Sequence, residues 1–223
     1  MKFRLPAVMF GLSIALSASG ASLFTNGDFG TGDLTGWSLD TDSAHVFDVT
    51  SASITPINGF PTVGPDGPST FYAVTDSDGP GEVAITQSFN LPGGILSAVL
   101  SFSYFVNDIF GDSGDASILI LDAGADPFTA TPVLSFGPFD TGLVNGNPNP
   151  WTEVNSGNLL TQGISTGVTY EIAAVEEDST GPVNLGVDNF DLEAQSAIPE
   201  PGMFLPVGLA AGFLLYRKAR ARS

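Results

Sequence analysis

The chain contains no cysteine. Disulfide bonds, thiolate nucleophiles and cysteine-ligated zinc sites are therefore excluded. Whatever fold this sequence adopts must be stable without covalent cross-links.

Basic residues are missing from nearly the whole chain. All six Lys and Arg residues lie at the two ends, against 24 Asp and Glu, and the formal net charge is −18. Leaving out Glu200, residues 22–197 carry 23 carboxylates (24 − 1) and a single histidine, His45. Nucleic acid is a poor partner for such a domain, because phosphate contacts need cations. Water, salt or divalent cations must relieve the self-repulsion; the alternative reading is that the charge serves only solubility outside the cell.

The first 21 residues have the three parts of a secretory signal peptide. Lys2 and Arg4 give a positive start, and the apolar run Leu5–Ala18 follows. The small residues Ser19-Gly20-Ala21 then provide a cleavage site before Ser22. We expect signal peptidase to remove residues 1–21 and the rest of the chain to be exported. The alternative is a buried N-terminal helix.

A second apolar stretch precedes the C-terminus. Gly202–Tyr216 makes roughly 22 Å of helix, whereas the hydrocarbon core of a bilayer is about 30 Å thick. A basic stop segment follows it and favours a cytoplasmic C-terminus: Arg217, Lys218, Arg220 and Arg222. We expect a short transmembrane helix that anchors the protein weakly, with residues 22–197 on the outer side.

The order of features in Ile198–Ser223 resembles the PEP-CTERM protein-sorting signal of Gram-negative bacteria. The motif Pro199-Glu200-Pro201 stands before the short glycine-containing helix and the arginine-rich end. The resemblance implies that an exosortase recognises this motif, removes the tail and releases the protein to the cell surface or the extracellular space. The alternative is an ordinary single-pass anchor.

The middle of the chain reads as one all-β domain, residues 22–197. Short apolar runs rich in Phe, Val, Ile and Thr alternate with Gly, Pro, Asn and Asp, and no helical stretch is evident. About ten strands in this length predict an antiparallel sandwich, most simply a jelly roll. The expected strands are Gly36–Leu39, Val46–Thr50, Phe71–Val74, Val83–Phe89, Ser97–Phe105, Ala116–Leu121, Val133–Phe136, Thr152–Val154, Thr169–Val175 and Leu185–Leu192.

The last expected strand changes phase. Leu185 and Val187 are apolar at odd positions, whereas Phe190 and Leu192 are apolar at even positions. A β-bulge near Asp188 would restore the alternation. Such a bulge brings an acidic side chain and backbone carbonyls together, so Asp188 is a candidate ligand of a structural calcium ion.

Both ends of the domain resemble galactose-binding-like jelly rolls, a family that includes many carbohydrate-binding modules. The opening run Leu23–Phe29 with Gly32–Trp37 is similar to the first strand of that family, and Val187–Leu192 to its last strand. The resemblance implies a structural calcium ion between these strands, with Asp188 at the acidic position. Gly30 stands where the family frequently has glutamate, which puts that site in doubt.

Two acidic loops are weaker calcium candidates. Asp76 and Asp78 alternate as in an EF-hand loop, but the twelfth position is Gln87, which lacks the bidentate carboxylate. Asp112 and Asp115, with Asp108 before them, form the second loop. The alternative for both loops is that acidic residues simply favour tight turns.

Catalysis has little support in the sequence. His45 lies in a strand-like run with no serine-elbow motif, and is expected at an edge or on the surface. Glu176-Glu177-Asp178 is expected to be a solvated strand end. A glycosidase carboxylate pair cannot be chosen among so many acids without geometry.

Trp151 is the aromatic residue best placed for stacking on a sugar, whereas Trp37 is expected in the core. Even for Trp151, packing is the favoured interpretation and stacking on a sugar is the alternative. The sequence thus predicts a non-enzymatic, exported protein with a structural or adhesive domain that meets extracellular polysaccharide. A carbohydrate-binding module is the alternative, and a polysaccharide hydrolase is the less favoured one.

Overall fold

The computed structural model describes eight stretches of the chain: residues 22–41, 45–57, 59–67, 69–77, 80–108, 114–139, 148–178 and 183–196. The expected signal peptide, Pro-Glu-Pro motif, transmembrane helix and basic stop segment lie outside them, as do Asp78 and Asp112. Within these stretches no helix has the length and apolarity needed to cross a bilayer.

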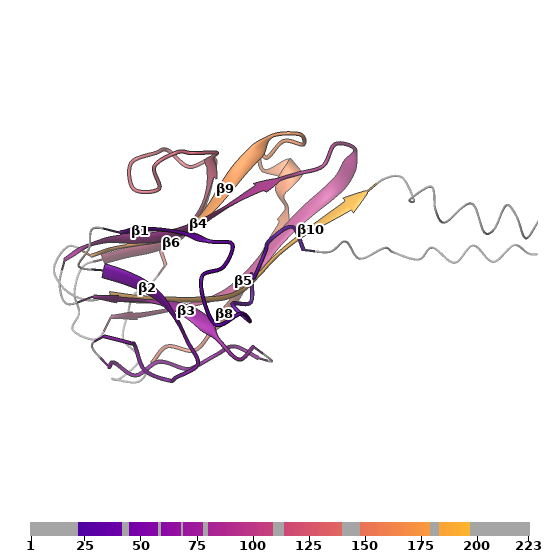
Figure 1. The fold of residues 1–223 in the computed structure, drawn as a ribbon. Coiled ribbons are helices and arrows are strands. Elements are labelled where there is room, and N and C mark those ends of the chain that lie inside the picture. The colour runs from indigo at the N-terminus through magenta and orange to yellow at the C-terminus, as the bar shows by residue number, and fades with distance from the viewer. Residues whose placement is uncertain are drawn as a thin grey trace, which may run out of the picture.

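Two five-stranded antiparallel sheets pack face to face (Figure 1). The first sheet has the order β1 (Ser38–Thr41), β4 (Gly81–Asn90), β9 (Thr169–Asp178), β6 (Gly114–Asp122) and β7 (Leu134–Phe136). The second has the order β2 (His45–Thr50), β3 (Tyr72–Ser77), β10 (Val183–Ser196), β5 (Ile95–Asp108) and β8 (Thr152–Asn158). A single 3₁₀ turn, Leu159–Thr161, follows β8. The predicted all-β sandwich is confirmed, and each expected strand overlaps an observed one.

The core lies between the sheets, where period-2 alternation directs every second side chain. On β5, Leu100 and Phe102 are buried in the core and Tyr104 packs against it. Ser101 and Ser103, which alternate with them along the strand, point to the opposite, outer face. Loop residues pack on the outer face of each sheet, so the sandwich has small apolar clusters outside its sheets as well as a core between them.

The predicted β-bulge is present in β10. The pairing of β10 with β5 shifts between Asp188 and Asp191, and Asn189 has a left-handed backbone with φ of 55°. Leu185 and Val187 before the bulge and Phe190 and Leu192 after it all point into the core. The extra residue thus restores the buried face of the strand.

The opening segment is not the strand that the family resemblance implied. Asn26 and Phe29 both have positive φ, near 50°, which a strand cannot accommodate. The segment nevertheless lies along β10, because Leu23 N–H donates to the Leu192 carbonyl and Phe190 N–H to the Gly27 carbonyl. Gly27 permits this approach, since a Cβ there would lie 2.0 Å from the Phe190 oxygen. Trp37 is in the core, as expected.

Candidate functional site

A polar cavity opens on the outer face of the second sheet. It has a volume of about 410 Å3. Its described lining combines hydroxyl, amide and carboxylate side chains with two apolar residues: Asp66, Gly67, Ser101, Phe102, Ser103, Glu153, Val154, Asn155 and Asn189. These residues come from β5, β8, the bulge in β10 and the loop before β3.

The floor of the cavity is set by the pairing of β5 with β8. Ser103 lies opposite Glu153 and Ser101 opposite Asn155, so four polar side chains face outward in two cross-strand pairs. Serine fills little volume, and two serines side by side leave the hollow open. Glu153 and Asn155 are exposed at its rim.

The bulge closes one end of the cavity. Asn189 Nδ2 donates to Asp66 Oδ2 at 3.3 Å, which ties the loop before β3 to β10. Behind this contact lies Asp188, whose side chain is fully buried. Its Oδ1 accepts from Asn189 N–H at 2.7 Å and its Oδ2 from Asp66 N–H at 3.2 Å.

Burial raises the pKa of Asp188 to about 7. The two backbone hydrogen bonds and a contact with Ser69 oppose that rise, while the nearby Asp66 carboxylate adds to it. Asp188 therefore changes its charge near neutral pH, directly behind the cavity wall.

The cation candidates do not converge on one centre. Asp188 and Asp66 bring two carboxylates together, but the described part of the chain holds no group of three or more acidic or histidine side chains suited to a metal ion. Asp76 is buried on β3, where Oδ2 accepts from Ile57 N–H. Asp115 is exposed on β6 of the other sheet.

Trp151 packs instead of standing free. Its ring meets Phe105 and Tyr72 edge-on, with centroids 4.7 and 5.7 Å away, and Nε1 donates to the Gly64 carbonyl at 2.8 Å. It belongs to the apolar layer over the second sheet and is not among the residues described as lining the cavity.

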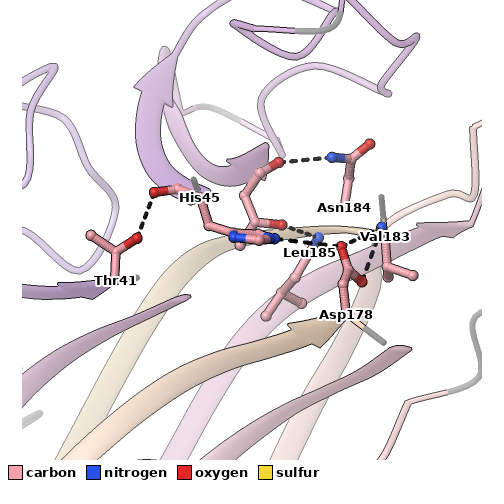
Figure 2. A network of polar contacts seen from close by, with 7 residues as sticks. Thr41, His45, Asp178, Val183, Asn184 and Leu185 are labelled. Carbon is pink, nitrogen blue, oxygen red and sulfur yellow. Dashed lines mark hydrogen bonds and ion pairs between the residues drawn. The ribbon is translucent and has the colours of Figure 1, made fainter. Parts of the chain in front are cut away.

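A second polar cluster lies inside the sandwich, at the end where β9 stops (Figure 2). His45 Nε2 lies 4.0 Å from Asp178 Oδ2, and both side chains are fully buried. Asp178 accepts from Val183 N–H through both oxygens, at 3.1 and 3.0 Å. Glu176, one step back on the same face of β9, is also buried.

This cluster corrects two expectations. His45 does lie on an edge strand, but its side chain points inward with Phe47 because both are on the core face of β2. Glu176 and Asp178 are not a solvated strand end: they continue the inward face of Ile172 and Ala174, and only Glu177 between them is exposed. Gly114 makes room for Asp178, since a Cβ there would lie 2.5 Å from its Oδ1.

Sequence reasoning missed the cavity. Ser101 and Ser103 were recognisable as the polar face of a strand, but nothing local indicated that Glu153 and Asn155 would lie beside them. That information is in the pairing of β5 with β8, two strands separated by β6 and β7 in the chain.

Comparison with known proteins gives a likeness of fold alone. No protein-family model matches the chain, and no curated protein does. Among solved structures, TmCBM61 in complex with β-1,4-galactotriose is similar over 78% of this chain and 99% of its own, at 17% identity and a TM-score of 0.51. The K3 cleaved adhesin domain of Lys-gingipain from Porphyromonas gingivalis covers 76% of this chain and 97% of its own, at 15% identity and a TM-score of 0.51. The described domain is an antiparallel β-sandwich of the jelly-roll kind.

Proposed function

We propose that residues 22–197 form a non-catalytic carbohydrate-binding domain whose site is the cavity on the outer face of the second sheet. The observation that carries this proposal is the cavity itself, a hollow of about 410 Å3 with a floor of serine hydroxyls and a rim of amide and carboxylate groups. Its volume lies within the usual range of small-ligand sites, roughly 300–1,000 Å3.

The lining suits sugar hydroxyls. Ser101, Ser103, Asn155 and Asn189 supply donors and acceptors, while Asp66 and Glu153 supply acceptors alone when ionised. The likeness to TmCBM61, which was solved with β-1,4-galactotriose, supports a sugar as the ligand class. The likeness to a cleaved adhesin domain supports an adhesive role for the same architecture.

We also propose that the domain works outside the cell. Support comes from the signal-peptide features of residues 1–21 and from the Pro199-Glu200-Pro201 motif with its apolar helix and basic end. In this proposal an exosortase removes the tail after export and the domain adheres to extracellular polysaccharide. Mass spectrometry of the protein from its native host should find mature termini near Ser22 and before Gly202; intact termini would contradict the proposal.

Calcium at the bulge remains a proposal as well. Asp188 and Asp66 provide two carboxylates there, and calcium binds carboxylate and carbonyl oxygens. If the ion binds at this place, calcium should raise the midpoint of thermal unfolding relative to chelator, and Asp188→Asn should abolish the rise. If calcium leaves the unfolding midpoint of the unmodified protein unchanged, the proposal of a calcium ion at the bulge is contradicted.

The carbohydrate proposal is tested by filling the cavity. Ser101→Tyr places a large side chain where a small hydroxyl now leaves space, so binding to any glycan identified on an array should fall at least tenfold. Ser135→Tyr is the matched control, because Ser135 is exposed on β7 of the other sheet. Equal binding by the two variants would contradict the assignment of the cavity.

A further inference from the structure

We infer that the cavity selects glycans with protonated amino groups, such as deacetylated glucosamine oligomers, over neutral and acidic glycans. This inference rests on the proposed carbohydrate-binding function and names the ligand class of the same site. Three features of the domain carry it: the carboxylates at the cavity, the absence of Lys and Arg from residues 22–197, and the lack of an exposed ring in the described lining.

Carboxylates stand on both sides of the cavity. Glu153 is exposed on β8, at one rim, and Asp66 lies at the other, where its Oδ2 accepts from Asn189 Nδ2. The serine hydroxyls lie between them on β5. A sugar seated on the serines therefore has an acidic group at each side, and an ammonium group on that sugar has a carboxylate within the same hollow.

No cation of the domain offsets these charges. Lys and Arg are absent from residues 22–197, and the single histidine, His45, is buried within the sandwich. A uronate or sulfate in the cavity would meet like charge and find no Lys or Arg partner. Acidic glycans are thus disfavoured by composition as well as by the local lining.

The described lining residues offer a neutral glycan hydrogen bonds but no exposed aromatic ring on which a sugar could stack. Phe102 is the one aromatic residue there, and its ring is turned into the core, where it packs on Phe190 and Phe136. Hydrogen bonds between an ammonium and a carboxylate are roughly twice as strong as neutral ones. The amino group therefore adds the largest single gain in affinity that this lining can provide.

The test compares tetrasaccharides that carry positive, zero and negative charge. The full-length protein, purified in mild detergent, is titrated at pH 5.5 with the glucosamine tetramer, the N-acetylglucosamine tetramer and tetragalacturonate. We expect the glucosamine tetramer to bind at least tenfold more tightly than its acetylated form, with a preference that shrinks as salt is added. Tetragalacturonate should show no binding.

Variants locate the effect. Glu153→Gln and Asp66→Asn should each weaken glucosamine binding several-fold, and should weaken N-acetylglucosamine binding by a clearly smaller factor, because that sugar loses only a hydroxyl acceptor. Asp40→Asn is the control, since Asp40 is exposed on β1 of the other sheet and its removal changes the net charge equally. Tetralysine serves as a cation without a sugar.

Each contrary result has a distinct meaning. Equal or tighter binding of the acetylated tetramer overturns the amine preference and leaves the carbohydrate function standing. Calcium-dependent binding of tetragalacturonate overturns the preference in favour of a cation bridge. If tetralysine binds as tightly as the glucosamine tetramer, and Asp40→Asn weakens the binding as much as the two cavity variants do, the preference is overturned in favour of a general attraction between the acidic domain and any cation. Failure of every glycan to bind, at any charge, overturns the proposed function itself.

Discussion

The surroundings of the Asp188 carboxyl group raise its pKa into the neutral range. Because burial raises its pKa from 3.8 to about 7, the folded protein holds this proton at pH values where the unfolded chain has lost it. The contribution of Asp188 to stability is therefore greatest below about pH 4, falls as the pH rises from 4 to 7, and is constant above the folded pKa.

Replacing Asp188 by asparagine should remove this pH dependence. The pKa shift of Asp188 corresponds to roughly 4 kcal/mol at most. The unfolding free energy of the unmodified protein should therefore fall by up to about 4 kcal/mol more than that of Asp188→Asn between pH 4 and pH 8. Denaturant unfolding across this range, with chelator present, measures the slope. Asp40→Asn, which removes an exposed carboxylate, should keep the slope of the unmodified protein; an unchanged slope in Asp188→Asn would show that the group ionises normally.

At the scale of elements, the close contact between β5 and β10 depends on a glycine. Gly186 lies opposite Phe105, whose ring covers it on the outer face of the sheet. A Cβ at position 186 would lie 2.1 Å from the Phe105 ring. The apolar layer formed by Phe105, Tyr72 and Trp151 thus requires the missing side chain.

Gly186→Ala should therefore destabilise the fold by about 1–3 kcal/mol, the usual cost of overpacking. Gly93→Ala is the matched control, because a Cβ at Gly93 has open space around it and should change stability by less than about 1 kcal/mol. Chemical denaturation of both variants measures the difference. Equal stability of the two would mean that the Phe105 ring moves aside freely.

Some features of the strands could be predicted from the sequence and others could not. Short apolar runs between turn residues predicted where the strands lie, and the phase change from Val187 to Phe190 predicted the bulge. The second half of β8, Asn155–Asn158, was missed because it has no apolar alternation and is held by its pairing with β5. The left-handed Asn26 was also missed, since its side chain bonds to Asp33 and Thr35 carbonyls seven and nine residues away.

Less of the candidate site than of the fold could be predicted from the sequence. The place of Asp188 at a bulge could be predicted because the bulge is visible as a change of period, while its role as a calcium ligand stays a prediction. His45 was misplaced because β2 is short, and its inward face is fixed by packing against the opposite sheet. The cavity depends on which strands become neighbours, and the period of a strand says nothing about its neighbour.

At the scale of the whole molecule, a polyanionic sandwich places its acids in two ways. Most of the acids that the structure describes are at least partly exposed, and a few, including Glu176, Asp178 and Asp188, are buried. The outer face of the second sheet combines carboxylates with a hollow, and the domain has no Lys or Arg to counter them. This arrangement disfavours an anionic ligand and favours a positively charged one most, and it links the composition of the chain to the proposed site.

Whether the cavity binds carbohydrate is measured most directly by mapping the NMR chemical-shift changes of the backbone amides during titration with a glycan that binds. If the cavity is the binding site, the largest changes occur at Ser101, Ser103, Asn155 and Asn189, and strands β1 and β4 of the other sheet remain unaffected. Changes concentrated on the first sheet, or spread evenly over the surface, would contradict it.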